Sequence, residues 1–196
     1  MNNLKQIALG MHNYAAANRT FPPAVVLGPD GKTPHSWRIA LLPYLEHQAL
    51  YQMYKLDEPW DSENNKKVAA TIPSVYRSPG VPAGNTTTSY VLPTNAKGMF
   101  TADAKKSGPE MRQIVDGLSN TVMILETDTG IPWTKPEDLP IEDGKLPKLG
   151  AAGQKTFNAA FADGSVRALP VDLDAKTFWQ LIQIGDGESI DQSKFK

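Results

Sequence analysis

The hydrophobic pattern of this chain changes character once along its length, and the change limits the folds it can form. Up to about residue 70 the apolar residues recur at helical spacing. From Thr86 onward the stretches TTSYVL, GMFT and NTVMILE are rich in β-branched and aromatic residues, which favour strands. A further helical pattern, DLDAKTFWQLIQIGDGE, follows near the end. Helices first, strands later and a closing helix predict an α+β fold.

The first helical pattern is the most regular one. In NNLKQIALGMHNYAAA, five apolar residues keep the i, i+3, i+4, i+7 spacing of one stripe: Leu4, Ile7, Ala8, Met11 and Ala15. The spacing predicts an amphipathic helix over residues 1–18, with a capping box of Asn3 and Gln6 at its start. A helix that begins this abruptly is also expected if it is the second half of a longer one.

Two further helical stretches have recognisable starts and breaks. In SWRIALLPYLEHQALYQMYKL, Ser36 is the predicted N-cap, and Pro43 predicts two short helices in place of one long one. DSENNKKVAATI predicts another short helix, capped by Asp61 or Ser62.

Turn chemistry organises the second half of the chain. FNAAFADGSVRALP predicts two short strands joined by Asp163-Gly164, a dipeptide suited to a type I′ hairpin turn. The segment before it, residues 131–153, is rich in proline and predicts a long surface excursion. With no fixed-period repeat, residues 1–196 are predicted to form one domain.

Composition argues against several functions. The net charge is -1 and the basic residues are scattered, so binding of nucleic acid through phosphate neutralisation is not expected. The chain has no cysteine, no G-x-S-x-G elbow and no glycine-rich phosphate loop, and its three histidines are not at metal-pair spacing. The sequence contains no run of roughly 18 apolar residues, so no membrane-spanning helix is predicted within it. We therefore predict a protein without catalytic residues or an organic cofactor.

Four residues are candidates for ligand contact. Trp60 and Trp133 both follow prolines in loop-like surroundings, where an exposed aromatic face suits a carbohydrate or protein contact. Anchoring in the core is the alternative for both tryptophans. Asp116 and Glu126 belong to IVDGLSNTVMILE, which also fits a plain turn at Gly117 followed by a buried strand.

The acidic stretch GDGESID is the only cofactor candidate that the sequence offers. Asp186, Glu188 and Asp191 supply oxygen ligands of the kind that Ca²⁺ prefers, although the stretch does not match an EF-hand loop. Ordinary Asp-Gly turn chemistry is the alternative. No other metal site is predicted.

Several stretches in order carry a family resemblance: NNLKQIALGMHNY running into FPPA, SWRIALLPYLEHQALY, PWDSENN, IVDGLSNTVMILE, PWTKPEDLP and FNAAFADGSVRAL. Together they resemble the bacterial family known as the domain of unknown function 1559, also labelled solute-binding and H-x9-DG, whose members usually carry a prepilin-type N-terminus. The resemblance implies a pilin- or pseudopilin-like fold, in which the N-terminal helix packs on an antiparallel sheet. It also implies an exported protein, periplasmic or on the cell surface, anchored through a hydrophobic helix that precedes residue 1.

This chain departs from the family pattern at two positions. Gly153 stands ten residues before Asp163, where the H-x9-DG pattern has its histidine. Ser78 stands where members often have a cysteine. A role for that histidine, and a disulfide at that position, therefore do not carry over to this sequence.

The sequence leaves three functions open. The first is a non-enzymatic, exported pilin-like domain acting in surface assembly or ligand contact, with protein partners. The second is an extracellular module that binds a small solute or carbohydrate, which predicts a concave pocket with exposed tryptophan and converging polar groups. The third is a carboxylate-based hydrolase, which requires Asp116 or Glu126 in a cleft. Contact with a membrane is expected only through the preceding helix.

Overall fold

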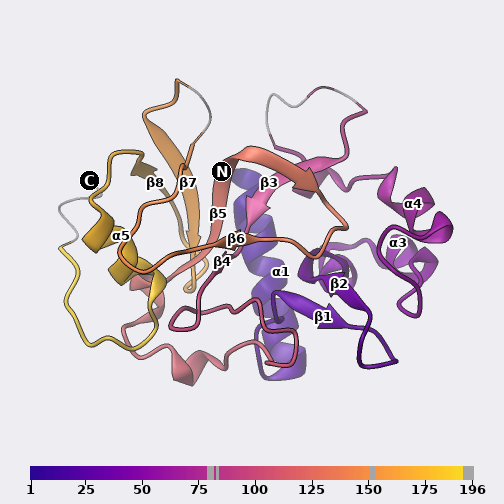
Figure 1. The fold of residues 1–196 in the computed structure, drawn as a ribbon, viewed down its shortest axis with the longest axis horizontal. Helices are drawn as coiled ribbons and strands as arrows, with labels where there is room; N and C mark the ends of the chain where they lie inside the picture. The colour runs from indigo at the N-terminus through magenta and orange to yellow at the C-terminus, as the bar shows by residue number, and fades with distance from the viewer. Residues whose placement is uncertain (79–81, 83, 151–152, 192–196) are drawn as a thin grey trace.

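The computed structural model describes residues 1–78, 82, 84–150 and 153–191 (Figure 1). Its centre is a four-stranded antiparallel sheet with the strand order β3-β5-β7-β8. These strands are β3 (Thr87–Val91), β5 (Val122–Pro132), β7 (Thr156–Phe161) and β8 (Val166–Pro170). Helices precede and follow these strands along the chain, which confirms the predicted α+β class.

Helices cover both faces of the sheet. On β7, Phe157, Ala159 and Phe161 pack in one apolar cluster with α5 (Ala175–Ile182), whereas Ala160 belongs to the cluster that contains α1 (Asn2–Asn18). Successive side chains of a strand point to opposite faces. The two helices therefore lie on opposite faces of the sheet.

The N-terminal helix buries the predicted stripe. Leu4, Ile7, Ala8 and Met11 are fully buried, and the helix ends at Asn18 as expected. The predicted capping box is wrong: Met1 is the N-cap, and the Asn3 side chain donates to the carbonyl oxygens of Ser74 and Arg77 at 3.3 and 2.8 Å. Among the described residues, no helix is both long and apolar enough to span a bilayer.

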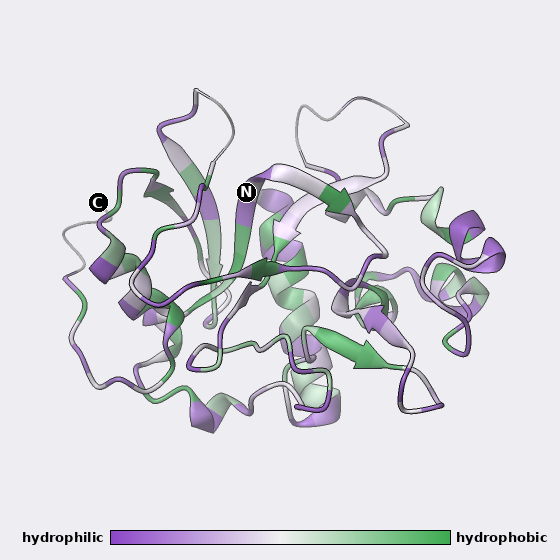
Figure 2. Ribbon diagram, viewed as in Figure 1, coloured by the Kyte–Doolittle hydropathy of each residue, from purple (hydrophilic) through white to green (hydrophobic). Residues whose placement is uncertain are grey.

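A group of short elements follows α1 along one side of the sheet. They are the paired strands β1 (Val25–Leu27) and β2 (Pro34–Ser36), the helices α2 (Trp37–Ala40), α3 (Gln48–Met53) and α4 (Glu63–Ala69), and the 3₁₀ helices η1 (Leu42–Leu45) and η2 (Ser74–Tyr76). The predicted caps are confirmed, since Ser36 accepts from the Arg38 N–H and Ser62 from the Asn65 N–H. Figure 2 shows β1 as hydrophobic and α4 as largely hydrophilic.

The predicted hairpin joins β7 to β8, but its turn type differs from the prediction. A type I′ turn needs positive φ at both central residues. Gly164 has a φ of 84°, whereas among the described non-glycine residues only Arg19 and Glu46 have positive φ, so Asp163 does not. The Phe161 N–H donates to the Ser165 oxygen, which makes a three-residue loop that ends in a left-handed glycine.

The segment 131–153, predicted as a surface excursion, is anchored in the core at several points, whereas residues 142–145 and 148 are exposed. Trp133, Thr134, Ile141 and Leu149 are buried, and β6 (Leu139–Pro140) pairs in parallel with β4 (Pro93–Thr94). In Figure 1 this segment crosses in front of the sheet. Residues 151–152 lie outside the described range.

The remaining elements are short. GMFT, predicted as a strand, forms only isolated bridges, which pair Thr94 with Phe100 and Gly98 with Gln183. Two 3₁₀ helices, η3 (Met111–Gln113) and η4 (Leu118–Asn120), precede β5.

Candidate functional site

The start of α2 places an arginine inside the protein. Ser36 caps the helix, and its hydroxyl oxygen accepts hydrogen bonds from the N–H and Nη1 of Arg38, at 3.2 and 3.0 Å. The Arg38 side chain has no solvent exposure. Because a guanidinium stays protonated in proteins, its burial requires an acidic partner and further acceptors.

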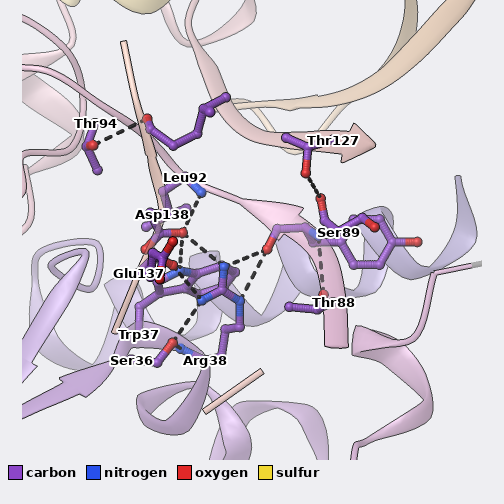
Figure 3. A network of polar contacts seen from close by, with 12 residues as sticks. Ser36, Trp37, Arg38, Thr88, Ser89, Leu92, Thr94, Thr127, Glu137 and Asp138 are labelled. Carbon is purple, nitrogen blue, oxygen red and sulfur yellow. Dashed lines mark hydrogen bonds and ion pairs between the residues drawn. The ribbon is translucent and has the colours of Figure 1, made fainter. Parts of the chain in front are cut away.

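Asp138 is that acidic partner, and it comes from the segment predicted as a loop. Its Oδ1 accepts hydrogen bonds from Arg38 Nη2 at 2.9 Å, Trp37 Nε1 at 3.1 Å and the Leu92 N–H at 2.8 Å. The Asp138 side chain is only 4% exposed. Figure 3 shows the carboxylate between Leu92 and the α2 side chains.

Backbone oxygens complete the environment of the guanidinium. The Tyr90 carbonyl accepts from Arg38 Nε and Nη2 at 3.2 and 2.7 Å, and the Glu137 carbonyl accepts from Nη1 at 3.4 Å. One side chain therefore joins α2, the sheet strand β3 and the segment around Asp138.

Burial and the opposite charge of Arg38 act on Asp138 in opposite directions. Burial raises the pKa of the Asp138 carboxyl, while the Arg38 guanidinium is the strongest influence that lowers it. Arg38 itself cannot release a proton under these conditions. The arrangement, which we call the clamp, can therefore hold chain segments together and fix the position of one carboxylate.

The two predicted tryptophans differ in their surroundings. Trp133 is fully buried, its Nε1 donates to the Ala69 carbonyl at 2.9 Å, and its ring stacks on Tyr76 at 6.0 Å between centroids. Trp133 is thus a core residue, which corrects its assignment as a surface contact. Trp60 is half-buried in the turn that precedes α4.

The two predicted acidic residues are engaged in separate places. Asp116 accepts from the N–H groups of Asp186 and Gly187 at 2.8 and 2.9 Å, so it fixes the turn after α5. Glu126 accepts from Asn158 Nδ2 at 2.5 Å within the sheet. No hydrogen bond or ion pair between described residues joins these two carboxylates.

The acidic stretch near the C-terminus is also occupied by internal contacts. Asp186 accepts from Gln183 Nε2 and from the Glu188 N–H, both at 2.8 Å, and Glu188 accepts from Gln180 Nε2 at 2.5 Å. Asp191 is the last described residue. Within the described part of the chain, no three His, Asp or Glu side chains gather in a way that could hold a metal ion. The described residues therefore give no support to the calcium site predicted from Asp186, Glu188 and Asp191.

A groove runs beside the outer side of α1. It has a volume of about 400 Å³ and lies between Gln6 and Leu9 of α1, the segment Tyr44–His47, and Ser74 with Val75. Leu9 is 61% exposed at its edge. A Cβ on Gly10 would lie 2.8 Å from Leu45 Cδ2, so this glycine allows η1 to approach the helix closely. We call this hollow the α1 groove.

Sequence reasoning did not single out Arg38 or Asp138. The one available signal was the charged residue within the apolar pattern WRIALL. It lies in the first turn of the helix, among residues that face the core. The partner, 100 residues further along the chain, has no local signature.

The fold and this clamp define an α+β domain in which a helix packs on an antiparallel sheet and an internal ion pair secures a long connection. A family model described as a protein of unknown function (DUF1559) matches residues 1–91 and 73–145. The chain belongs to this family, and the matched ranges include both Arg38 and Asp138. Comparisons with curated proteins and with solved structures gave no match.

Proposed function

We propose that this chain is a non-enzymatic, exported domain of pilin- or pseudopilin-like architecture that acts in surface assembly through the outer side of α1. The N-terminal helix packed on one face of an antiparallel sheet is the arrangement that the family resemblance implied, and it supports the architectural part of this proposal. The exported location follows from the same resemblance.

The observation that carries the proposal is the exposure of Leu9 beside the α1 groove, whose lining mixes apolar and polar side chains. The apolar stripe of α1 is buried in the core, whereas Leu9 is 61% exposed and lies next to Leu45 and Val75. Gln6 and His47 lie at the same groove and give it polar groups. Protein–protein contacts commonly combine apolar side chains of this kind with polar groups.

The engagement of the candidate acids supports a non-enzymatic role. Asp116 fixes a turn, Glu126 bonds Asn158, and Asp138 is paired with Arg38. Each carboxylate already has a partner that accounts for its position in the fold.

Self-association tests the proposal, with a second copy of the chain as the partner. We expect wild-type protein to associate as its concentration rises in sedimentation equilibrium, and Leu9→Glu to remain monomeric because a charge then enters the contact. Met53→Glu is the matched control, because Met53 on α3 is 60% exposed and lies outside the α1 groove. Association of Leu9→Glu equal to that of the control, or no association of the wild type, would contradict the proposal.

Binding of a small solute or carbohydrate is the second candidate function. The buried state of Trp133 removes one of the two aromatic platforms that this function was expected to use. Hollows beside the fixed carboxylate of Asp138 favour it nonetheless.

A further inference from the structure

Two hollows flank residues 136–140, which we call the strap. One, of about 320 Å³, lies toward β1 and β4, and the other, of about 230 Å³, lies toward β5. Asp138 lines both of them. The β5-side hollow has an apolar wall of Val91, Ile131 and Leu139, and Thr129 and Lys148 also line it.

The charges around the β5-side hollow compensate one another. Three carboxylates line it, and each has its own cation: Asp138 pairs with Arg38, Asp128 with Lys148, and Glu137 with Lys135. The Lys148 ammonium also lowers the pKa of Asp128, which keeps this carboxylate ionised. Because no carboxylate of the lining lacks a counter-charge, the hollow favours a neutral ligand over an ion.

One oxygen of Asp138 accepts no hydrogen bond from the described residues. Oδ1 accepts all three hydrogen bonds that Asp138 makes with described residues, and Oδ2 accepts none of them. The side chain is nevertheless 4% exposed and held rigidly by its three donors. A carboxylate fixed in this way meets a hydroxyl donor without first losing side-chain entropy.

We propose that the β5-side hollow binds a neutral hydroxylated solute, a polyol or a monosaccharide. A ligand hydroxyl donates to Asp138 Oδ2, and the C–H face of the ligand packs on Ile131 and Leu139. The inference rests on the second candidate function and gives it a location and a ligand class. It uses none of the residues of the α1 groove, so the assembly proposal stands or falls separately.

Titration of the folded chain with neutral and charged probes tests the ligand class. The probes are glucose, mannitol and myo-inositol, with glucuronate and glucosamine as charged counterparts. We expect at least one neutral probe to bind with a dissociation constant on the order of 1 mM, as suits a small, half-open hollow. Amide shifts in two-dimensional NMR should then centre on Thr129, Ile131 and Leu139.

Two blocking variants locate the binding. Thr129 and Ala102 are both exposed, and each lines one hollow only, Thr129 on the β5 side and Ala102 on the other. We expect Thr129→Phe to weaken binding about tenfold or more, which corresponds to at least 1.4 kcal/mol, and Ala102→Phe to leave it unchanged.

Several results would overturn the inference. If no neutral probe binds at about 20 mM, the proposed site is refuted, because an affinity weaker than this does not indicate a specific binding site. Tighter binding of glucuronate or glucosamine would leave solute binding in place but refute the neutral ligand class. Binding that survives Thr129→Phe, or is lost in Ala102→Phe, would refute the location. The NMR map of the wild type decides the location even if a variant fails to fold.

Discussion

Arg38 Nη2 lies 2.9 Å from Asp138 Oδ1, although the two residues are 100 positions apart in the chain. Both side chains are removed from solvent, with exposures of 0% and 4%. The pair fastens the strap to α2, and the Tyr90 carbonyl fastens the same guanidinium to the sheet. The properties of this pair, and of the segments that it joins, lead to specific expectations.

Removal of one member of the buried pair should be strongly destabilising. In Arg38→Met the Asp138 carboxylate keeps its buried position without a counter-charge, and we expect the free energy of unfolding to fall by about 3–5 kcal/mol in urea titrations. Adding Asp138→Leu to this variant should restore part of the loss, because the uncompensated charge is then gone. Lys66→Met removes an exposed ion pair with Glu63 and is the control, with little change expected. Equal effects of Arg38→Met and Lys66→Met would refute the clamp.

Truncation of the two tryptophans should separate a core residue from a peripheral one. Trp133→Ala removes a fully buried ring and its bond to Ala69, so we expect a loss of about 3–5 kcal/mol. Trp60→Ala should cost clearly less, since this ring is only half-buried. Guanidinium titrations followed by far-UV circular dichroism measure both. A larger loss at Trp60 than at Trp133 would contradict the packing described above.

The turn before β5 depends on a glycine. Gly117 has φ and ψ of 99° and 135°, which lies outside the left-handed helical region that asparagine tolerates. We therefore expect Gly117→Ala and Gly117→Asn to lower the free energy of unfolding by a similar amount, about 1–3 kcal/mol. Thermal melts followed by circular dichroism provide the comparison. An asparagine variant that melts like the wild type would show that the turn does not need glycine.

Stability should decline in mildly acidic solution because of His35. This histidine is buried and bonded to the Tyr54 hydroxyl and the Leu56 carbonyl, and burial lowers its pKa below the ordinary value of 6.5. As the pH falls below 6.5, the unfolded chain takes up a proton at this position before the folded chain does, so the free energy of unfolding decreases. Urea titrations between pH 8 and pH 5 should show this decline in the wild type and a weaker one in His35→Gln. An identical pH dependence in both proteins would exclude His35 as the cause.

Local sequence signals correctly predicted those helices whose first backbone N–H groups are capped by a nearby side chain. Ser36 and Ser62 cap their helices as expected, and the apolar stripe from Leu4 to Met11 is buried. These contacts span only a few positions, so spacing and residue type are sufficient to recognise them. The predicted capping box of α1 was wrong because the side chain of Asn3 donates instead to carbonyl oxygens more than seventy positions away.

The prediction of a surface excursion over residues 131–153 missed the buried anchors of this segment for a related physical reason. Prolines exclude a central strand, but they do not prevent a segment from being buried when side chains anchor it. Trp133 and Asp138 provide those anchors through partners on α4 and α2, and neither partner has a sequence signal that points to this segment. Proline content therefore predicted that the segment lacks a regular central strand, but it did not predict whether the segment is buried or exposed.

By itself, the sequence determined the α+β class, the family, the helix starts at Ser36 and Ser62, and the glycine-dependent turns. These properties depend on backbone sterics and on apolar periodicity, which act over a few residues. Only the tertiary structure decided that Arg38 meets Asp138, that Trp133 is a core residue, and that Asp138 lines a hollow with an apolar wall. Such contacts follow from the packing of segments distant in the chain, because a buried charge is tolerated only where the whole fold brings its partner to it.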